Sequence, residues 1–242
     1  MIDFNPRDAV IERMPLIAIS VPLQPQSHAY LLPNVDTSPI AGLEAVAKRA
    51  IDILVAGLLL LVLALPMCLM AVVIKLDSPG PVLFRQRRIG KDNRPFDLLK
   101  FRTMYHHQPE CGRLRQTTRR DRRVTRVGVL LRHLSVDELP QLLHVLGGQM
   151  SLVGPRPHAP GSCAGGTPFE QISDWYPLRH SVRPGMTGLA QVRGWRGETD
   201  TRDKLIMRLA SDLEYIESWR LSLDFIILVR TVGAVLRMRN AY

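Results

Sequence analysis

A run of 22 residues without a charged side chain, residues 53–74, limits what this chain can fold into more than any other feature of its sequence. A helix of about 20 apolar residues is long enough to cross the hydrocarbon core of a bilayer. A core helix of this length in a water-soluble domain would show a polar face. The run therefore predicts a membrane helix, with a buried core helix as the alternative.

Basic residues stand on both sides of this run, with Lys48 and Arg49 before it and Lys75 after it. Basic flanks favour the cytoplasmic side of a membrane, and a straight spanning helix satisfies only one flank. Pro66 lies past the middle of the run, where it removes a backbone hydrogen bond and bends a helix. We therefore predict a re-entrant helix over residues 46–76 that enters the membrane, breaks near Pro66 and returns to the same face.

The segments on either side of this helix differ in composition. Residues 1–45 contain six prolines, which break any long helix, so we expect a poorly ordered N-terminal extension with at most a short strand near residues 16–21. No basic segment followed by an apolar core, as in a secretory signal peptide, is visible at the start. Residues 77–242 are expected to form one catalytic domain of mixed α/β structure, mostly helical.

Hydrophobic periodicity and turn residues predict the elements of that domain. In the helix expected at residues 205–221, Ile206, Leu209, Leu213 and Ile216 share one stripe. The charged residues Arg208, Asp212 and Glu214 are expected away from that stripe. The more apolar residues 223–236 read either as an interfacial helix or as a core helix. The other expected elements are strands at 82–84 and 96–101 around a loop at 90–93, helices at 124–134 and 139–146, and a Pro- and Gly-rich loop over 153–188.

Composition narrows the partners without choosing one. Lys and Arg outnumber Asp and Glu by 32 to 22, so the formal net charge is +10. Such a surface attracts nucleic acid, anionic lipid or phosphate-bearing substrates, and charge alone does not separate them. The three scattered cysteines predict a reducing compartment and no disulfide framework. The seven histidines show no metal-ligand spacing and are expected to be solvated or core residues.

Two adjacent carboxylates, Asp137 and Glu138, are the most distinctive local feature. One interpretation is a capping box, with Ser135 at the N-cap and Glu138 three residues later. The other is a catalytic pair, because eight arginines lie between residues 113 and 132. Arginines and Mg²⁺ neutralise phosphate charge, and a carboxylate can attack phosphorus to give an acyl phosphate.

Seven stretches in a fixed order resemble the bacterial sugar transferase family, the monotopic phosphoglycosyl transferases. The resemblance covers residues 47–242 of this chain. The matching stretches are KRAID at 48–52, KLDSPGPV at 75–82, FRQ at 84–86, KFRTM at 100–104, SVDELPQL at 135–142, MSLVGPRP at 150–157 and RPGMTG at 183–188.

The resemblance implies a re-entrant membrane helix, a catalytic domain on the cytoplasmic face of the inner membrane, and a ping-pong reaction. Asp137 looks like the nucleophile that attacks the sugar-bearing phosphate of a UDP-sugar and releases UMP. Polyprenyl phosphate then takes the sugar phosphate from the aspartate. Glu138 matches the partner carboxylate, which orients Mg²⁺ or handles a proton, so both carboxylates are implied metal ligands. The implied phosphate-binding residues are Arg132 and Arg156, with Lys100, Arg102, Arg183 and Arg196 as further candidates.

The C-terminal part is similar to a subgroup of the family. Residues 194–201 and 240–242 resemble members that start exopolysaccharide repeat units with hexose-1-phosphate, commonly from UDP-glucose and sometimes from UDP-galactose. The implied partners are a UDP-sugar, undecaprenyl phosphate and membrane lipids, with no nucleic acid, and a homodimer is left open. Two alternatives are an N-acetylhexosamine-1-phosphate transferase of the same family and a membrane-tethered basic binding protein.

This chain departs from the family pattern at three positions. Leu65 precedes Pro66 where the family usually has serine, so no hydroxyl is available for a freed carbonyl. Gln149 replaces an acid that the family often has before Met-Ser. Trp195 stands where some members that use N-acetylated sugars have an arginine, with Arg196 as the candidate substitute. The chain resembles the short form, without the additional N-terminal membrane helices of longer relatives.

Overall fold

The computed structural model describes residues 40–106, 121–195, 197 and 199–236 of this chain. Most of the expected N-terminal extension, Cys111, Arg196 and the last six residues lie outside these residues. The described part is mixed α/β and mostly helical, as expected. Its strands form three two-stranded sheets.

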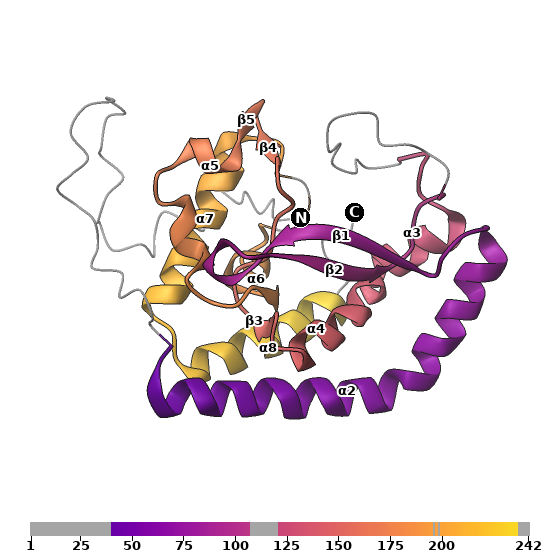
Figure 1. Ribbon diagram of the computed structural model, residues 1–242, viewed down its shortest axis with the longest axis horizontal. Coiled ribbons are helices and arrows are strands. Elements are labelled where there is room, and N and C mark those ends of the chain that lie inside the picture. Colours follow the sequence, from indigo (N-terminus) through magenta and orange to yellow (C-terminus); the bar gives the residue numbers. More distant parts are fainter. Residues whose placement is uncertain (1–39, 107–120, 196, 198, 237–242) are drawn as a thin grey trace, which may run out of the picture. The chain divides into compact units, whose positions relative to one another are not determined.

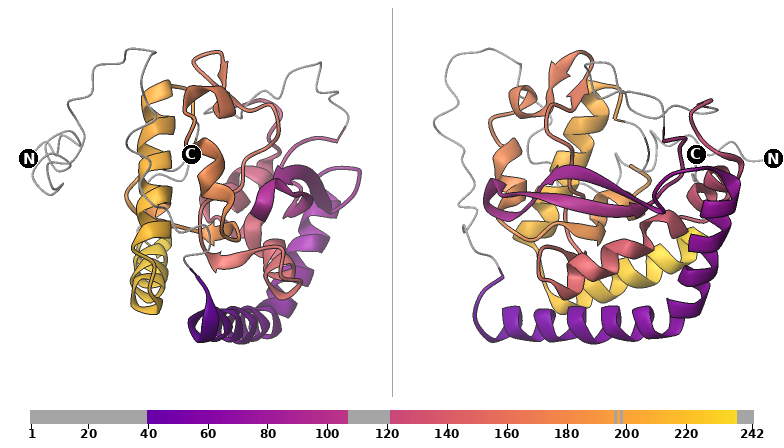
Figure 2. Two further views of the ribbon diagram at one scale, coloured as in Figure 1. Left: turned by 60° about the vertical axis from the view of Figure 1, so that its left-hand side comes forward. Right: turned by 45° about the vertical axis from the view of Figure 1, so that its right-hand side comes forward.

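The apolar run lies within α2, Gly42–Asp77, a helix of 36 residues. Figure 1 shows that α2 runs straight for more than half of its length and then bends sharply, and both views in Figure 2 show the same bend. Pro66 is the proline inside α2, and it cannot donate the backbone hydrogen bond that would keep the helix straight.

The apolar side chains of α2 face outward. Leu54, Leu61 and Leu65 are each at least 70% exposed. Among the described residues, α2 is the one helix that is long and apolar enough to cross a membrane. The alternative of a buried core helix is therefore wrong, because a core helix would bury this surface rather than present it.

An antiparallel hairpin follows α2. Strand β1, Leu83–Ile89, pairs with β2, Pro95–Phe101, so that Leu83 lies opposite Phe101. The turn passes through the short helix η1, Lys91–Asn93, where Asp92 and Asn93 adopt left-handed backbone conformations that these residue types tolerate. Strand β1 extends beyond the predicted strand at 82–84. The prediction was too short because the arginine-rich second half of this exposed strand lacks an apolar pattern.

The next segment brings the two adjacent carboxylates onto a short turn. Thr125 caps α3, Arg126–His133, by accepting a hydrogen bond from the Gly128 amide. The predicted helix at 139–146 is in fact a 3₁₀ turn, η2, Val136–Gln141, followed by α4, Leu142–Leu146. Pro140 lies inside η2 and has no amide hydrogen for a regular helix.

The rest of the domain closes around a parallel strand pair. Strand β3, Ser151–Val153, pairs with β6, Gly185–Thr187. The connection between them is mostly loop, as predicted, with four short elements. These are β4, Cys163–Ala164, β5, Thr167–Pro168, α5, Phe169–Ile172, and η3, Tyr176–His180. Helices α6, Leu189–Val192, α7, Arg202–Glu217, and α8, Leu221–Leu236, complete the chain.

The buried face of α7 differs from the predicted stripe. Leu209 and Ile216 are buried as expected, but Ile206 is 41% exposed. Asp212, expected off the stripe, is buried and forms an ion pair with Arg179. A buried charge requires a partner, and an apolar pattern alone does not reveal that one is present.

Several polar contacts join the start of α2 to the rest of the domain. Lys48 Nζ lies 2.5 Å from the Asp224 carboxylate of α8, and both side chains are about 90% buried. Asp52 accepts a hydrogen bond from the Leu152 amide of β3. Arg49 donates to two carbonyls at the end of α4. Lys48 and Arg49, the basic residues before the apolar run, therefore attach α2 to the rest of the domain. Any effect of their charge on membrane orientation is separate from this structural role.

We predict that Lys48→Met destabilises the protein, because Asp224 would be left as a buried charge without its cation. Removal of one partner from a buried ion pair typically costs about 3–5 kcal/mol. Thermal unfolding in detergent measures the change. The control is Arg87→Met, in an exposed ion pair with Asp97, where a loss below about 1 kcal/mol is expected. Equal effects of the two substitutions would contradict the role given to Lys48.

Candidate functional site

A cavity of about 1620 Å³ contains the two adjacent carboxylates. Hairpin β1–β2, the turn η2, the segment 156–159 and helices α2, α7 and α8 contribute to its walls. Of the eight candidate residues, six line this cavity: Lys100, Arg102, Arg132, Asp137, Glu138 and Arg156.

The backbone of η2 presents the two carboxylates to the cavity. Ser135 adopts a left-handed conformation, with φ of 57°, at the entry to the turn. The Ser135 side chain makes no capping hydrogen bond, and Glu138 is bonded to two cations instead of a backbone amide. The capping-box interpretation is therefore wrong for this segment.

Glu138 is held between Lys100 and Arg156. Its Oε1 accepts from Lys100 Nζ at 2.8 Å, and its Oε2 accepts from Arg156 Nη1 at 2.9 Å. The second terminal nitrogen of Arg156 also donates to Oε1, which makes the arginine contact bidentate. Burial alone would raise the pKa of Glu138, but Arg156 and Lys100 outweigh it and hold that pKa well below its usual range.

Asp137 has the opposite environment. It is 92% buried, and its carboxylate makes no hydrogen bond or ion pair within the described part of the chain. Burial, and then the negative charge of Glu138, raise the pKa of Asp137 to about 6, against the weaker opposing effects of Lys100 and Arg132. Asp137 is therefore charged at neutral pH while both of its oxygens remain available to a ligand.

Residues that the sequence did not indicate hold Arg156 in place. Arg179 donates to the backbone carbonyl of Arg156 at 2.8 Å and forms a buried ion pair with Asp212. The Tyr176 hydroxyl accepts from another nitrogen of the same guanidinium. The signal in the sequence for this cluster was Asp212, a charged residue whose helical position places it on the buried face of α7.

Arg132 lies at the edge of the carboxylate pair and lines the cavity. Its Nε donates to Thr103 Oγ1 at 2.8 Å. Its two terminal nitrogens make no hydrogen bond to a described residue, so they can bind an anion in the cavity.

Two other predicted phosphate-binding arginines serve the fold. Arg102 is 96% buried, and its guanidinium donates to the Ser78 and Pro79 carbonyls at 2.6 and 2.8 Å, at the C-terminal end of α2. These bonds satisfy two backbone carbonyls in the turn that directly follows α2. Arg183 does not line the cavity, and its Nε donates to the Gly148 carbonyl. Arg196 lies outside the described residues.

The departure at Gln149 lies outside the cavity. The Leu99 amide donates to His144 Nε2 at 3.0 Å, so the ring is neutral with its hydrogen on Nδ1. Gln149 Oε1 lies 2.6 Å from Nδ1 and accepts that hydrogen. An amide oxygen supplies this contact without the charge of an acid.

Magnesium prefers carboxylate and phosphate oxygens and keeps several waters. The described residues contain no group of three or more His, Cys, Asp or Glu side chains that could hold a metal by themselves. Asp137 fits such an ion because both of its oxygens are available. Glu138 fits less well, since Lys100 and Arg156 already engage both of its oxygens.

The structure thus places a buried and a partly buried carboxylate among cations, in a cavity that an exposed apolar helix of membrane length helps to line. A family model described as bacterial sugar transferase matches residues 43–238. The chain belongs to this family. The matched residues include α2 except Gly42, the residues that line the cavity, and the whole of α8.

Three curated relatives of this family member carry related names. An undecaprenyl-phosphate glucose phosphotransferase of Komagataeibacter xylinus is 50% identical over 84% of this chain and 38% of its own length. Two proteins named UDP-glucose:undecaprenyl-phosphate glucose-1-phosphate transferase, from Escherichia coli K12 and Caulobacter vibrioides, are 46% and 49% identical. They match 87% and 81% of this chain, and 44% and 72% of their own lengths. The chain thus spans about two fifths of the first and second relatives.

We predict that Asp137→Asn raises thermal stability at pH 8 in metal-free buffer. An aspartate in the unfolded chain ionises near its ordinary pKa, whereas folded Asp137 resists ionisation up to a pKa of about 6. Wild-type stability therefore falls, relative to the variant, as pH rises from about 4 to 6, by roughly 2–3 kcal/mol. Unfolding midpoints at pH 4 and pH 8 measure this, with the exposed Asp97→Asn as control. A gain that is the same at both pH values would contradict it.

Proposed function

We propose that this chain transfers glucose-1-phosphate from UDP-glucose to undecaprenyl phosphate and releases UMP, as a first step of exopolysaccharide assembly. The observation that carries the proposal is the unequal pair in the cavity, in which Glu138 is bound by two cations and Asp137 is buried without a partner. The names of the relatives support the choice of donor and acceptor.

In the first half-reaction, an oxygen of ionised Asp137 attacks the sugar-bearing phosphorus of UDP-glucose. A phosphorus–oxygen bond to the aspartate forms, the diphosphate bond breaks, and UMP leaves with the bonding electrons. In the second half-reaction, a phosphate oxygen of undecaprenyl phosphate attacks the same phosphorus and releases Asp137. The lipid-linked product therefore carries a diphosphate between the isoprenoid and glucose.

The cations of the cavity serve both half-reactions. Lys100, Arg132 and Arg156 neutralise charge that develops on the phosphate oxygens, and their fixed positions avoid reorganisation during the reaction. Glu138 holds Lys100 and Arg156 in ion pairs. These two cations are therefore kept from pairing with Asp137, a contact that would block its attack on phosphorus. The raised pKa of Asp137 also makes it a more basic nucleophile than an ordinary aspartate.

We further propose Mg²⁺ as the cofactor, held by Asp137 and the substrate diphosphate, with Glu138 beside it. When bound, the ion would supply additional neutralisation of the diphosphate charge. The nearby cations already neutralise Glu138, so its main part in this proposal is to position Lys100 and Arg156.

For the membrane, we propose that α2 enters from the cytoplasmic face and returns to it. The same domain contacts both ends of α2, through Lys48 and Asp224 at its start and through Arg102 and Ser78 at its end. A helix that crossed the bilayer straight would have its two ends on opposite sides. A single domain on one side of the bilayer could not contact both ends. The bend of α2 and its exposed apolar surface support this placement.

Helix α8 extends the apolar surface beside α2. Phe225, Val229 and Val232 are each at least 55% exposed on α8. Of the two interpretations of residues 223–236, this exposure supports an interfacial helix, although Ile227 and Asp224 on the opposite face are buried.

A screen of UDP-sugars tests the proposed reaction. We expect UMP release that requires both undecaprenyl phosphate and Mg²⁺ for multiple turnover, and that is fastest with UDP-glucose. UDP-galactose and UDP-N-acetylgalactosamine belong in the screen, because a relative from Aeromonas hydrophila at 40% identity is named as an N-acetylgalactosaminephosphotransferase. Faster turnover with an N-acetylated donor would shift the assignment within the family, and no UMP from any donor would overturn it.

Substitution of the two carboxylates separates their roles. Asp137→Asn removes the nucleophile, so we expect loss of UMP release by at least about three orders of magnitude. Glu138→Gln retains the nucleophile and lets Lys100 and Arg156 approach it, so we expect a smaller loss, of roughly one to two orders of magnitude. An Asp137→Asn variant with near wild-type turnover would contradict the proposal.

Cysteine labelling tests the membrane placement. In a variant without native cysteines, Glu44→Cys and Lys91→Cys place exposed thiols before and after the apolar run. The re-entrant arrangement predicts that an impermeant reagent added to intact cells labels neither thiol, and that it labels both after lysis. Labelling of one thiol alone in intact cells would indicate a spanning helix instead.

A further inference from the structure

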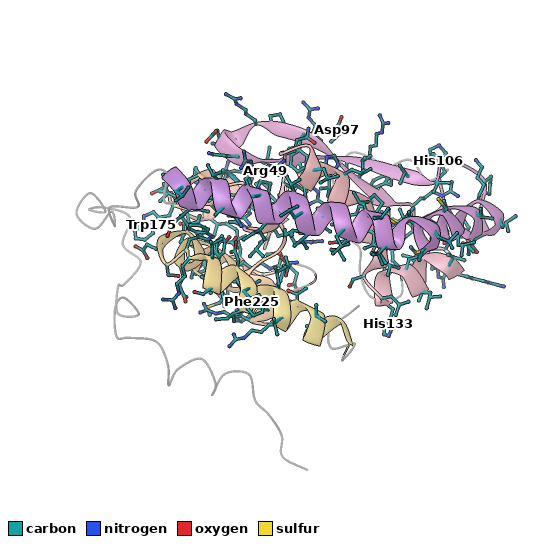
Figure 3. The ribbon with its side chains drawn as sticks, turned by 90° about the horizontal axis from the view of Figure 1, so that it is seen from below. Arg49, Asp97, His106, His133, Trp175 and Phe225 are labelled. Carbon is teal, nitrogen blue, oxygen red and sulfur yellow. The ribbon has the colours of Figure 1, made fainter. Side chains whose placement is uncertain are left out.

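The cavity that contains Asp137 continues into an apolar groove between α2 and α8. Val55 and Leu59 of α2 and Leu228 and Val232 of α8 line the same cavity as the carboxylate pair. Each pair is four residues apart and therefore lies on one face of its helix. Figure 3 shows the two helices close together at one end and diverging along their lengths.

Further apolar side chains close to the carboxylates in sequence also line the cavity. Leu139 and Leu142 follow Asp137 along the chain, and both line the cavity. The hydroxyls of Thr187 and Thr231, also in the lining, lie 2.7 Å apart and satisfy each other. This wall therefore offers its ligand mainly apolar contacts.

Two parts of the cavity lining differ in chemistry. Lys100, Arg132 and Arg156 surround Asp137 and favour an anion. In the part formed by α2 and α8, Leu59 and Val232 are 38% and 59% exposed, on helices whose outer surfaces are themselves apolar. A ligand that complements both parts has an anionic head and a long apolar chain that leads toward the bilayer. A nucleotide sugar, polar along its whole length, complements only the charged part.

We propose that this groove binds the isoprenoid chain of the polyprenyl phosphate acceptor and guides its phosphate to Asp137. The inference rests on the proposed function and deepens it, because it assigns a binding site to the second substrate. Leu59 and Val232 are the contact residues that can be changed with least effect on folding, since both are partly exposed.

Matched substitutions on the two helices test this groove. Leu59→Asn and Val232→Asn place an amide in the groove. Leu58→Asn and Val229→Asn place one on residues outside the cavity lining that are 61% and 55% exposed. In lipid nanodiscs, each variant is assayed for the UMP burst without acceptor, and for kcat/KM with undecaprenyl phosphate and with short-chain farnesyl phosphate.

We expect Leu59→Asn and Val232→Asn to lower kcat/KM for undecaprenyl phosphate by about tenfold, with a smaller loss for farnesyl phosphate. The amplitude of the UMP burst should match the wild type, and the two control variants should lose less than about threefold. This result would support the groove as the site of the isoprenoid chain.

Equal losses in the groove and control variants would overturn the inference and indicate a general effect on membrane contact or a bound bilayer lipid. An unchanged kcat/KM in the groove variants would overturn it as well. In both cases a UMP burst from the wild type leaves the proposed function intact. Absence of a burst from the wild type with every UDP-sugar would instead remove the proposed function, and the inference with it.

Discussion

The ion pairs of Glu138 with Lys100 and Arg156 determine which charged groups in the cavity are paired and which remain available to a ligand. They neutralise the partly buried Glu138 and leave its buried neighbour, Asp137, without a partner. The environments thus push the pKa values of the two acids apart, the arrangement by which neighbouring carboxylates take different chemical roles. Without Glu138, the nearest cations would turn to Asp137 and lower both its pKa and its basicity.

The support for this arrangement extends well beyond the cavity. Arg156 depends on Arg179, which bonds to its backbone carbonyl, and Arg179 depends on the buried carboxylate of Asp212 on α7. Lys100 stands on β2, whose next residues lead to Arg102 and the end of α2. The fold therefore couples the geometry of the carboxylate pair to α2, which suits the proposed transfer to a membrane-borne acceptor.

Some of this could be read from the sequence. The length and composition of α2 identified it as a membrane-length helix, because a long uncharged run indicates an apolar environment. Pro66 indicated that this helix bends. The hairpin and the carboxylate pair followed from turn residues and from local charge. Local patterns also misled. Ser135 and Glu138 have capping-box spacing, yet Ser135 makes no capping hydrogen bond and Glu138 pairs with Lys100 and Arg156, which are distant in sequence.

The remaining features depend on partners that no local pattern specifies. Arg102 and Arg183 look like phosphate ligands by residue type, yet backbone carbonyls of Ser78 and Gly148 engage them. Asp212 reads as a surface acid of an amphipathic helix until Arg179, 33 residues away, is known to pair with it. Residue type and spacing give the chemistry available, whereas tertiary contacts determine which charges remain available to a substrate.

The proposed reaction depends on a covalent bond between Asp137 and the sugar phosphate. The most direct measurement is mass spectrometry of protein quenched after mixing with UDP-glucose in the absence of undecaprenyl phosphate. We expect a hexose-phosphate adduct on the peptide that contains Asp137, and we expect it to disappear when undecaprenyl phosphate is added before the quench. UMP release with no adduct on that peptide, or an adduct that persists in the presence of acceptor, would contradict it.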